Sequence, residues 1–220
     1  MAHTARGCFI TLEGGEGAGK TTHVQSTADY LRQQGIDVIT TREPGGTAVS
    51  EAIRAVLLNP DLPDMHADTE LLLMFAARNE HLQRKIIPAL EQGQWVICDR
   101  FTDATYAYQG YGRGLLLERI AELERWVQGE LRPDCTLLFD LDVEIGMQRV
   151  RQRSVDQAVG IDRFEREQAA FFNKIREGYL MRAQASAGRF HKLDAAQPVE
   201  KVRQAIIEVL DTVLQQWRQA

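Results

Sequence analysis

The sequence predicts an α/β fold in which one parallel β-sheet is covered by helices on both faces. Short apolar runs alternate with helical patterns along nearly the whole chain, and glycine or proline marks most of the junctions. Because consecutive parallel strands are joined by right-handed crossovers, the intervening helices have to cover both faces of the sheet. With 220 residues, of which 44% are hydrophobic, the chain suits one compact domain. We therefore predict a single three-layer α/β/α domain over residues 1–220, built on a five-stranded parallel sheet.

The predicted strands are short apolar runs, such as GCFITLE and WVIC. Glu13, Arg42, Asp99 and Asp140 lie at or just past the ends of four of them. Ligands of such folds bind outside the carboxyl ends of the strands, so we expect these four side chains to converge there. The five predicted strands are residues 7–13, 37–41, 95–98, 135–139 and 189–193.

Helical patterns fill the segments between these strands. Gly35 ends the first helix, and Asn59-Pro60 ends the second. Asp68 is placed to begin a third helix, in which Pro88 predicts a kink. Residues 152–162 have poor apolar periodicity and predict an exposed loop. The predicted helices are residues 20–34, 47–58, 68–90, 103–109, 115–127, 143–151, 164–185 and 199–217.

Composition excludes several classes of protein. The net charge of -5 argues against a general nucleic-acid binder, which usually carries a basic face. No segment approaches the roughly 18 consecutive apolar residues of a membrane helix, and the polar residues 1–6 do not resemble a secretory signal. Cys8, Cys98 and Cys135 lie in strand-like runs without metal-binding spacing. We expect reduced core thiols and a cytoplasmic protein with no membrane and no nucleic-acid partner.

A phosphate-binding loop follows the first predicted strand. Its pattern is G-x-x-x-x-G-K-T, flanked by a strand and a helix as this motif requires. Its glycines let successive backbone N–H groups point at phosphate oxygens, and the helix N-terminus adds partial positive charge. Lys20 would reach the β- and γ-phosphates, while Thr21 and the strand-end Asp99 would hold Mg²⁺. The predicted ATP-binding residues are Gly14, Gly15, Glu16, Gly17, Ala18, Gly19, Lys20, Thr21 and Thr22.

A phosphate-binding loop alone does not separate kinases from GTPases or motor ATPases. The single Asn-Lys pair, Asn173-Lys174, is followed by Ile-Arg inside a helical pattern, so the N-K-x-D guanine motif of GTPases is missing. A chain of 220 residues also leaves little room for a motor domain. A small-molecule kinase is the favoured class, and a nucleotide switch or binding module is the alternative outside the enzymes.

The variable positions of the loop carry no cation and include the acidic Glu16. Phosphoryl transfer nevertheless needs positive charge around the moving group. Arg149, Arg151, Arg153 and Arg163 flank the predicted exposed loop. We predict that residues 149–163 form a short mobile lid, which brings arginines over the phosphates and excludes water when it closes.

Five segments, taken in order, resemble bacterial thymidylate kinases, the ATP:dTMP phosphotransferases. The resemblance implies a P-loop kinase fold, transfer of the ATP γ-phosphoryl group to dTMP to give dTDP for dTTP synthesis, Mg²⁺ dependence, and a homodimer packed through helices of the first half. The alternative is another P-loop nucleoside monophosphate or small-metabolite kinase. The segments are EGGEGAGKTT (13–22), TREPGGT (41–47), LLLMFAAR (71–78), CDRFTDATYAYQGYGRG (98–114) and RPD…FDLDVEIG (132–146).

The resemblance also implies roles around the acceptor phosphate and sugar. Glu16 is similar to the acid that meets the 3′-hydroxyl of dTMP, and Arg100 to the arginine that grips its phosphate. Arg42 and Glu43 should lie near this phosphate and the magnesium ion, which makes Glu43 a third candidate metal ligand. Pro44 resembles a family cis-proline.

Around the base, the resemblance implies that Phe75 stacks on thymine while Arg78 and Gln109 read its edge. Tyr108 is similar to the tyrosine that crowds the sugar 2′ position. The lid arginines resemble those of family members whose P-loop lacks an arginine. Ala104, where many relatives have serine, and Tyr111, where glycine is usual, depart from the pattern. The implied dTMP-binding residues are Glu16, Arg42, Glu43, Pro44, Arg54, Phe75, Arg78, Arg100, Thr105, Tyr108 and Gln109, and the implied catalytic residues are Lys20, Asp99, Arg100, Arg149, Arg151 and Arg153.

Overall fold

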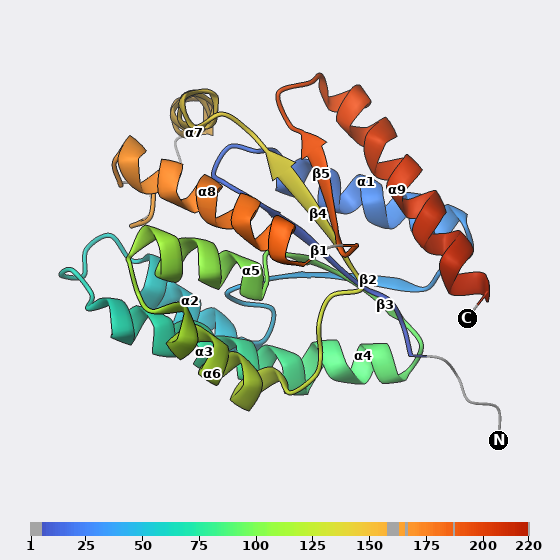
Figure 1. Ribbon diagram of the computed structural model, residues 1–220, viewed down its shortest axis with the longest axis horizontal. Helices are drawn as coiled ribbons and strands as arrows, with labels where there is room; N and C mark the ends of the chain where they lie inside the picture. Colours follow the sequence, from blue (N-terminus) through green and yellow to red (C-terminus); the bar gives the residue numbers. More distant parts are fainter. Residues whose placement is uncertain (1–5, 158–162, 166, 187, 220) are drawn as a thin grey trace.

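A computed structural model describes residues 6–157, 163–165, 167–186 and 188–219 of the chain. Within these residues, five strands form one sheet in the order β2-β3-β1-β4-β5, and every neighbouring pair is parallel (Figure 1). The predicted α/β class and five-stranded parallel sheet are therefore confirmed. The strands are β1 (Phe9–Gly14), β2 (Val38–Arg42), β3 (Trp95–Asp99), β4 (Cys135–Asp140) and β5 (Phe190–Asp194).

The register of the sheet brings the expected polar residues to one edge. Arg42 at the end of β2 is level with Asp99 at the end of β3, and Asp99 is level with Leu12 of β1. On the other side of β1, Gly14 is level with Phe139, the residue before Asp140. The carboxyl ends of β2, β3, β1 and β4 therefore form a common rim, as the sequence predicted.

Helices cover both faces of the sheet (Figure 1). One face carries α1 and α9, and the other carries α3, α4, α5 and α8, while α2 and α6 pack on the outer side against α3. Helix α7 crosses the carboxyl rim beside the loop that follows β1. The helices are α1 (Lys20–Gln33), α2 (Ala48–Leu58), α3 (Ala67–His81), α4 (Ile87–Glu91), α5 (Thr102–Thr105), α6 (Leu117–Gln128), α7 (Val143–Gln157), α8 (Ala169–Ala185) and α9 (Val199–Gln219).

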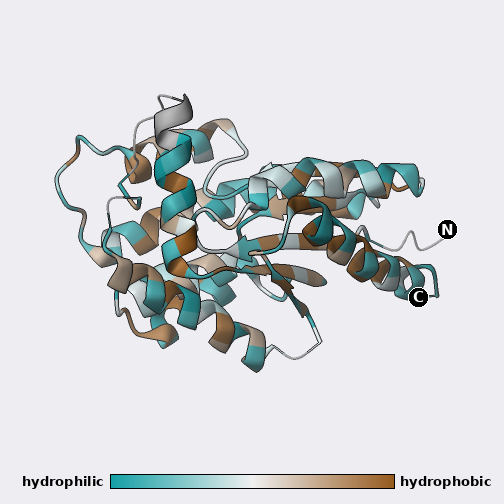
Figure 2. Cartoon of the chain, turned by 90° about the horizontal axis from the view of Figure 1, so that it is seen from above, coloured by the Kyte–Doolittle hydropathy of each residue, from teal (hydrophilic) through white to brown (hydrophobic). Residues whose placement is uncertain are grey.

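Two apolar layers hold the sheet between the helices. Successive residues of a strand point to opposite faces, and β4 shows the consequence: Leu137 packs into the cluster shared with α1 and α9, whereas Leu138 packs into the cluster shared with α8. All strands but the outer two are buried along nearly their whole length. Figure 2 shows the hydrophobic strands at the centre, with the hydrophilic sides of the helices turned outward.

Two predicted helices contain π-helical turns. The helix expected over 68–90 consists of α3, the π-helical segment η1 (Leu82–Ile86) and α4. Pro88 is the second residue of α4; it has no N–H to donate, and its ring displaces the preceding turn. The helix expected over 103–109 is α5 followed by the π-helical η2 (Tyr106–Gly112).

Two predicted boundaries around the lid were wrong. Helix α7 does not end at residue 151 but continues to Gln157. Residues 152–157 lack the apolar periodicity that predicts a helix, but they contain no glycine or proline that would end one. Helix α8 starts at Ala169 and not at residue 164, because Phe164 is buried in a turn against other aromatic rings. The remaining part of the predicted lid, residues 158–162, lies outside the described residues. None of the described helices is long and apolar enough to span a lipid bilayer.

Candidate active site

The P-loop connects β1 to α1 at the centre of the carboxyl rim. Gly14, Gly17 and Gly19 have φ angles of 141°, 70° and 87°, a region that other residues adopt at a cost. A Cβ atom on Gly17 would lie 2.3 Å from the carbonyl oxygen of Gly146 in α7, so the loop and this helix can approach only because glycine is present. The curled backbone and the N-terminus of α1 make a ready cradle for phosphate groups.

Lys20 begins α1 and reaches back across this loop. Its Nζ donates to the carbonyl oxygens of Gly14 at 3.0 Å and Gly15 at 2.8 Å. Burial lowers the pKa of Lys20 to about 8, with the charge of Arg100 acting in the same direction. A bound polyphosphate would supply the negative charge that this buried ammonium group needs.

A cavity of about 960 Å³ opens along the P-loop and the first turn of α1. The start of α9, with the loop before it, forms the opposite wall, and Arg149 and Arg153 of α7 lie at one side. All of the predicted ATP-binding residues from Glu16 to Thr22 line this cavity, whereas Gly14 and Gly15 line a neighbouring one. The cavity has the position and the lining expected of a nucleoside triphosphate site.

Two of the three predicted magnesium ligands lie together. The hydroxyl of Thr21 donates to Oδ2 of Asp99 at 3.2 Å, and Oδ1 of Asp99 is buried without a partner among the described residues. An unpartnered carboxylate oxygen beside a hydroxyl suits a hard cation such as Mg²⁺, so the residues present fit the metal. Glu43 instead uses both carboxylate oxygens in contacts with Arg78 and His81, and its role as a ligand stays a prediction.

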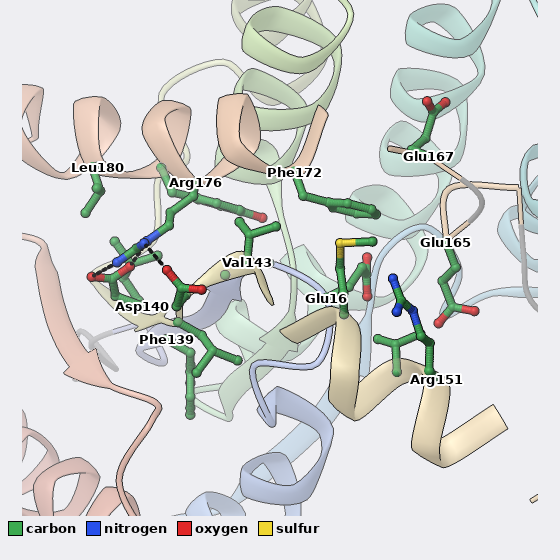
Figure 3. Close-up of a pocket in the computed structure, with 18 residues that line it drawn as sticks. Glu16, Phe139, Asp140, Val143, Arg151, Glu165, Glu167, Phe172, Arg176 and Leu180 are labelled. Atoms are coloured by element: carbon green, nitrogen blue, oxygen red, sulfur yellow. Dashed lines mark hydrogen bonds and ion pairs between the residues drawn. The ribbon is translucent and has the colours of Figure 1, made fainter. Parts of the chain in front are cut away.

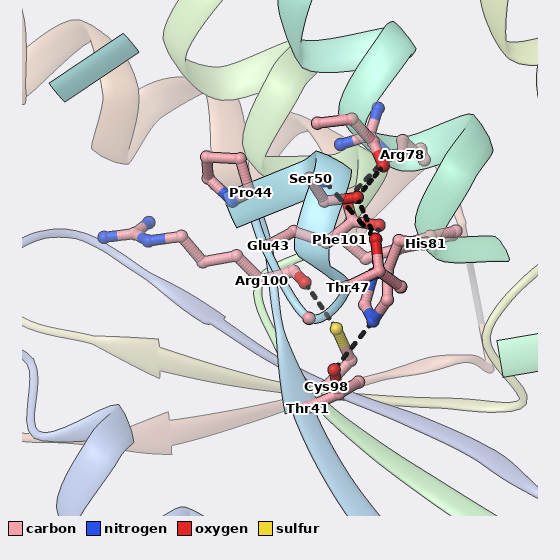
Figure 4. Close-up of polar contacts among 12 residues, drawn as sticks. Thr41, Glu43, Pro44, Thr47, Ser50, Arg78, His81, Cys98, Arg100 and Phe101 are labelled. Carbon is pink, nitrogen blue, oxygen red and sulfur yellow. Dashed lines mark hydrogen bonds and ion pairs between the residues drawn. The ribbon is translucent and has the colours of Figure 1, made fainter. Parts of the chain in front are cut away.

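The corner after β2 is built around Glu43 (Figure 4). The buried Glu43 accepts from Nε of Arg78 at 2.8 Å and contacts Nδ1 of His81 at 3.1 Å, and His81 contacts the Thr41 hydroxyl through Nε2. The Glu43–Pro44 peptide bond is cis, as the resemblance implied. This network fixes the Arg78 guanidinium group against the strand ends.

Arg100 follows β3 in a left-handed conformation, with φ of 68°. This conformation is costly for a residue with a Cβ atom and is typical of functional sites. Its guanidinium group donates to Glu16 at 2.7 Å and to the Gly14 carbonyl oxygen at 2.9 Å, and it lies over the ring of Tyr108 at 4.9 Å. The structure therefore joins the predicted phosphate-gripping arginine directly to the P-loop.

Glu16 accepts from both Arg100 and the Tyr108 hydroxyl, the latter at 2.8 Å. Burial acts to raise the pKa of Glu16, but the charges of Arg100 and Lys20 and the Tyr108 hydrogen bond outweigh it, so that the pKa is lowered. Glu16 is therefore held within the P-loop as an ionised hydrogen-bond acceptor.

A second cavity, of about 360 Å³, lies between Arg100, the corner at Pro44 and α3. Glu16, Lys20, Thr21 and Arg153 line both this cavity and the one along the P-loop, so the two cavities adjoin. Of the predicted dTMP-binding residues, those that line the second cavity are Glu16, Arg42, Glu43, Pro44, Arg54, Arg100 and Tyr108.

Four predicted acceptor residues lie deeper, on the facing surfaces of α3 and of the helix formed by α5 and η2. Nη2 of Arg78 donates to the Thr105 hydroxyl at 2.9 Å. Nη1 of Arg78 and Oε1 of Gln109 are buried without partners among the described residues. Phe75 lies in an apolar cluster with Arg78 against its ring, whereas its neighbour Met74 lines the cavity; a base-stacking role for Phe75 stays a prediction.

The three lid arginines lie in two different places. Arg149 donates to the carbonyl oxygens of Ala195 and Gly17, and Arg153 forms an ion pair with Glu165 while lining both cavities. Arg151 lines a third cavity, of about 260 Å³, which lies between α7 and α8 and is also lined by Gly14 and Gly15 (Figure 3). The structure thus brings Arg149 and Arg153, but not Arg151, to the P-loop cavity.

Several residues of this region were not predicted from the sequence. Glu165 holds Arg153, His81 supports Glu43, and Met74 lines the second cavity. Glu165 lies two residues after the predicted lid, and this position was the one feature of the sequence that suggested a role for it. His81 carried no signal, because its partner Glu43 is far away along the chain. Met74 lies in the family-like segment 71–78, where Phe75 was chosen in its place.

A P-loop opening into one cavity, adjoined by a second cavity with its own arginine, defines a P-loop phosphotransferase with separate donor and acceptor sites. The family described as thymidylate kinase matches residues 12–206 of the chain. Thymidylate kinases of Pseudomonas putida and Pseudomonas entomophila are each 57% identical to it, over 210 and 212 residues, covering 96% of this chain and 99% of the relative. The thymidylate kinase of Alkalilimnicola ehrlichii is 54% identical over 212 residues, 96% of each chain. The chain belongs to the thymidylate kinase family.

Proposed function

We propose that this chain transfers the γ-phosphoryl group of ATP to dTMP and so produces dTDP for dTTP synthesis. The observation that carries the proposal is the pair of adjoining cavities, in which Glu16, Lys20, Thr21 and Arg153 line both. A phosphoryl group can pass between substrates only when donor and acceptor meet at reaction distance, and a shared wall permits this.

The acceptor would lie with its phosphate at Arg100 and its sugar at Glu16 and Tyr108. Arg100 offers a planar guanidinium group fixed by several contacts, which suits a phosphate monoester. The ionised Glu16 is an acceptor for a sugar hydroxyl. Nη1 of Arg78 would donate to thymine O4, and Oε1 of Gln109 would accept from N3–H, because these two buried atoms are a donor and an acceptor without partners among the described residues.

The reaction needs no covalent enzyme intermediate, since the acceptor phosphate attacks the γ-phosphorus directly. Mg²⁺, held by Thr21 and Asp99, would neutralise charge on the β- and γ-phosphates when bound. Lys20, Arg149 and Arg153 add positive charge around the transferred group, and the side chains above the P-loop restrict water.

Assembly and location belong to the same proposal. Ala48, Val49, Ala52, Ala55 and Val56 are all exposed and cover one side of α2. A continuous exposed apolar stripe of this kind is typical of a subunit interface, and it supports a homodimer. The buried free thiols support a reducing cytoplasmic setting.

The test is a coupled ADP-release assay with ATP, Mg²⁺ and a series of acceptors: dTMP, dUMP, dCMP, dGMP and AMP. We expect dTMP to be the best acceptor and dUMP the next. A clear preference for any other nucleotide would reject the proposal in favour of another nucleoside monophosphate kinase, the alternative within this class. Absence of transfer to every acceptor would favour a small-metabolite kinase or a nucleotide-binding module.

A further inference from the structure

Glu70 is a buried carboxylate that the proposed chemistry does not use. It lies in the first turn of α3, and its side chain has 0% of its surface exposed. It accepts from Nη2 of Arg163 at 2.5 Å, from Nε of Arg113 at 3.3 Å and from Nε2 of Gln109 at 2.8 Å. Burying a carboxylate is costly unless it is paired. Two arginines therefore hold Glu70 in place, and its third donor is the predicted base reader.

This contact determines how the amide of Gln109 is turned. A glutamine amide has an NH₂ group that donates and an oxygen that accepts, and the two differ little in shape. Because two guanidinium groups already donate to Glu70, its carboxylate has only acceptors to offer Gln109. The NH₂ group must then face Glu70, and Oε1 must face away, where it is buried without a partner among the described residues.

Arg78 supplies the second half of the pattern. Its Nε and Nη2 donate to Glu43 and Thr105, which leaves Nη1 as a buried donor without a described partner. The contacts Glu70–Gln109 and Arg78–Thr105 join the same two helices. The two helices therefore present one donor held in place, Nη1 of Arg78, and one acceptor held in place, Oε1 of Gln109.

Pyrimidines differ in this pattern. Thymine and uracil carry an acceptor at O4 and a donor at N3, which complement Arg78 and Gln109. Cytosine carries a donor at N4 and an acceptor at N3, so both of its groups would meet groups of the same kind. A buried mismatch of this sort leaves hydrogen-bonding groups unpaired, and such groups discriminate strongly between substrates.

We propose that Glu70 is a specificity-determining residue: by fixing the orientation of the Gln109 amide, it makes the acceptor site reject cytosine nucleotides. Glu70 is a positioning residue, since it acts through Gln109. The inference rests on the proposed function, because it assumes that a pyrimidine base lies against Arg78 and Gln109.

The substitution Glu70→Gln tests this role. The oxygen of the new amide would accept from Arg113 and Arg163, so that its NH₂ group would face Gln109. The Gln109 amide would then turn over and present NH₂ to the base. We expect the ratio of kcat/KM for dTMP to that for dCMP to fall at least about tenfold. The ratio for dTMP to dUMP should stay constant, because these two bases share the same edge.

Asp103→Asn is the matched control. Asp103 is also a buried carboxylate paired with two arginines, Arg182 and Arg189, but it does not contact Gln109. A purely structural defect lowers kcat/KM for all acceptors together, so Asp103→Asn should leave the dTMP to dCMP ratio unchanged. If Glu70→Gln does not fold, the charge-balanced double variant Glu70→Gln/Arg113→Gln is measured in its place.

The outcomes separate this inference from the proposed function. If the unmodified protein does not prefer dTMP to dCMP, the proposed function itself fails. If it does prefer dTMP, and the folded Glu70 variant keeps the same ratio, the inference alone is rejected. A lower ratio in both the Glu70 and the Asp103 variants would also reject it, because the effect would then not depend on Gln109.

Discussion

At the scale of single residues, Glu13 is a buried carboxyl group near the end of β1 that should make the stability of the protein depend on pH. It accepts from the backbone N–H of Phe101 at 2.7 Å and from the hydroxyl of Tyr179 at 3.0 Å. Burial, together with the nearby charge of Asp103, raises the pKa of Glu13 to about 8 from an ordinary value of 4.5. Between these two pH values, the folded protein therefore holds a proton that the unfolded chain has released.

The sign of the resulting pH dependence follows from linkage. When the folded state binds more protons than the unfolded state, the free energy of unfolding falls as pH rises. Glu13 should therefore reduce stability progressively from about pH 4.5 to about pH 8, with a slope of at most about 1.4 kcal/mol per pH unit. We expect Glu13→Gln to lose less stability than the parent between pH 5 and pH 8, as measured by urea unfolding.

Two other groups near Glu13 have shifted pKa values, but they change the free energy of unfolding outside the range from pH 5 to pH 8. The lowered pKa of Asp103 changes stability only below its ordinary value of 3.8, and the lowered pKa of Lys20 changes stability between about pH 8 and pH 10.5. Parallel stability curves for the parent and Glu13→Gln from pH 5 to pH 8 would show that Glu13 does not hold a proton in the folded protein.

Among single residues, the sequence predicted those that belong to a local motif. Lys20, Thr21 and Asp99 are adjacent to a glycine-rich loop or a strand end, and the structure brings them together. Glu70 and His81 could not be predicted in this way, because the role of a buried polar residue on a helix depends on which residues it contacts in the folded protein. Those partners lie 39 residues away in Gln109 for Glu70, and 38 residues away in Glu43 for His81.

At the scale of elements, the extension of α7 to Gln157 sorts the lid arginines. Residues four positions apart lie on the same face of a helix, whereas residues two positions apart point about 200° apart. Arg149 and Arg153 accordingly line the cavity along the P-loop and the first turn of α1, and Arg151 lines the cavity against α8. An exposed loop after residue 151 would not impose this division, so the sequence alone predicts the same role for all three arginines.

Replacing Arg153 should affect catalysis more than replacing Arg151. Arg153→Ala removes a positive charge from a side chain that lines both substrate cavities, so kcat should fall about 10²–10³-fold while the KM for dTMP changes little. Arg151→Ala, on the same helix, is the matched control, with a smaller loss in kcat. Full turnover by Arg153→Ala would contradict a catalytic role for Arg153, and equal losses would show that Arg151 also reaches the phosphates.

Most strands were predictable because they are short apolar runs, and most helices because their apolar residues recur with helical periodicity. The boundaries that failed, at Gln157 and Ala169, lie where periodicity is weak and tertiary contacts decide. Phe164 matches a helical stripe, but its ring packs against Tyr108 and the Arg163 guanidinium group in a turn. Propensity alone does not distinguish these two environments.

At the scale of the whole molecule, the order of the strands places the two cavities that we propose for the substrates. Strand β1 lies between β3 and β4, so its P-loop opens at the centre of the sheet, with Arg100 on one side and α7 on the other. The right-handed crossovers predicted this layering from the sequence. The strand order itself was not predicted, because it depends on which strands pair over long distances.

The apolar stripe on α2 is the surface through which we propose that the molecule assembles. Its five exposed residues repeat at helical spacing within a face about 120° wide. On the adjacent α3, Leu72 has 57% of its surface exposed, although Leu71 beside it is buried in the core. The two helices pack side by side, and each of them carries exposed apolar side chains.

Val56→Glu should convert the proposed homodimer to a monomer. Val56 has 43% of its surface exposed, so a glutamate there is tolerated in the single chain, but a symmetric interface would bury the charge and bring it near its own copy. Light scattering coupled to size exclusion should give about twice the chain mass of 24.9 kDa for the parent and the single mass for the variant. Met181→Glu, at a 45% exposed position on α8, is the matched control and should leave the mass of the dimer unchanged. A monomeric parent, or a dimeric Val56→Glu variant, would reject this interface.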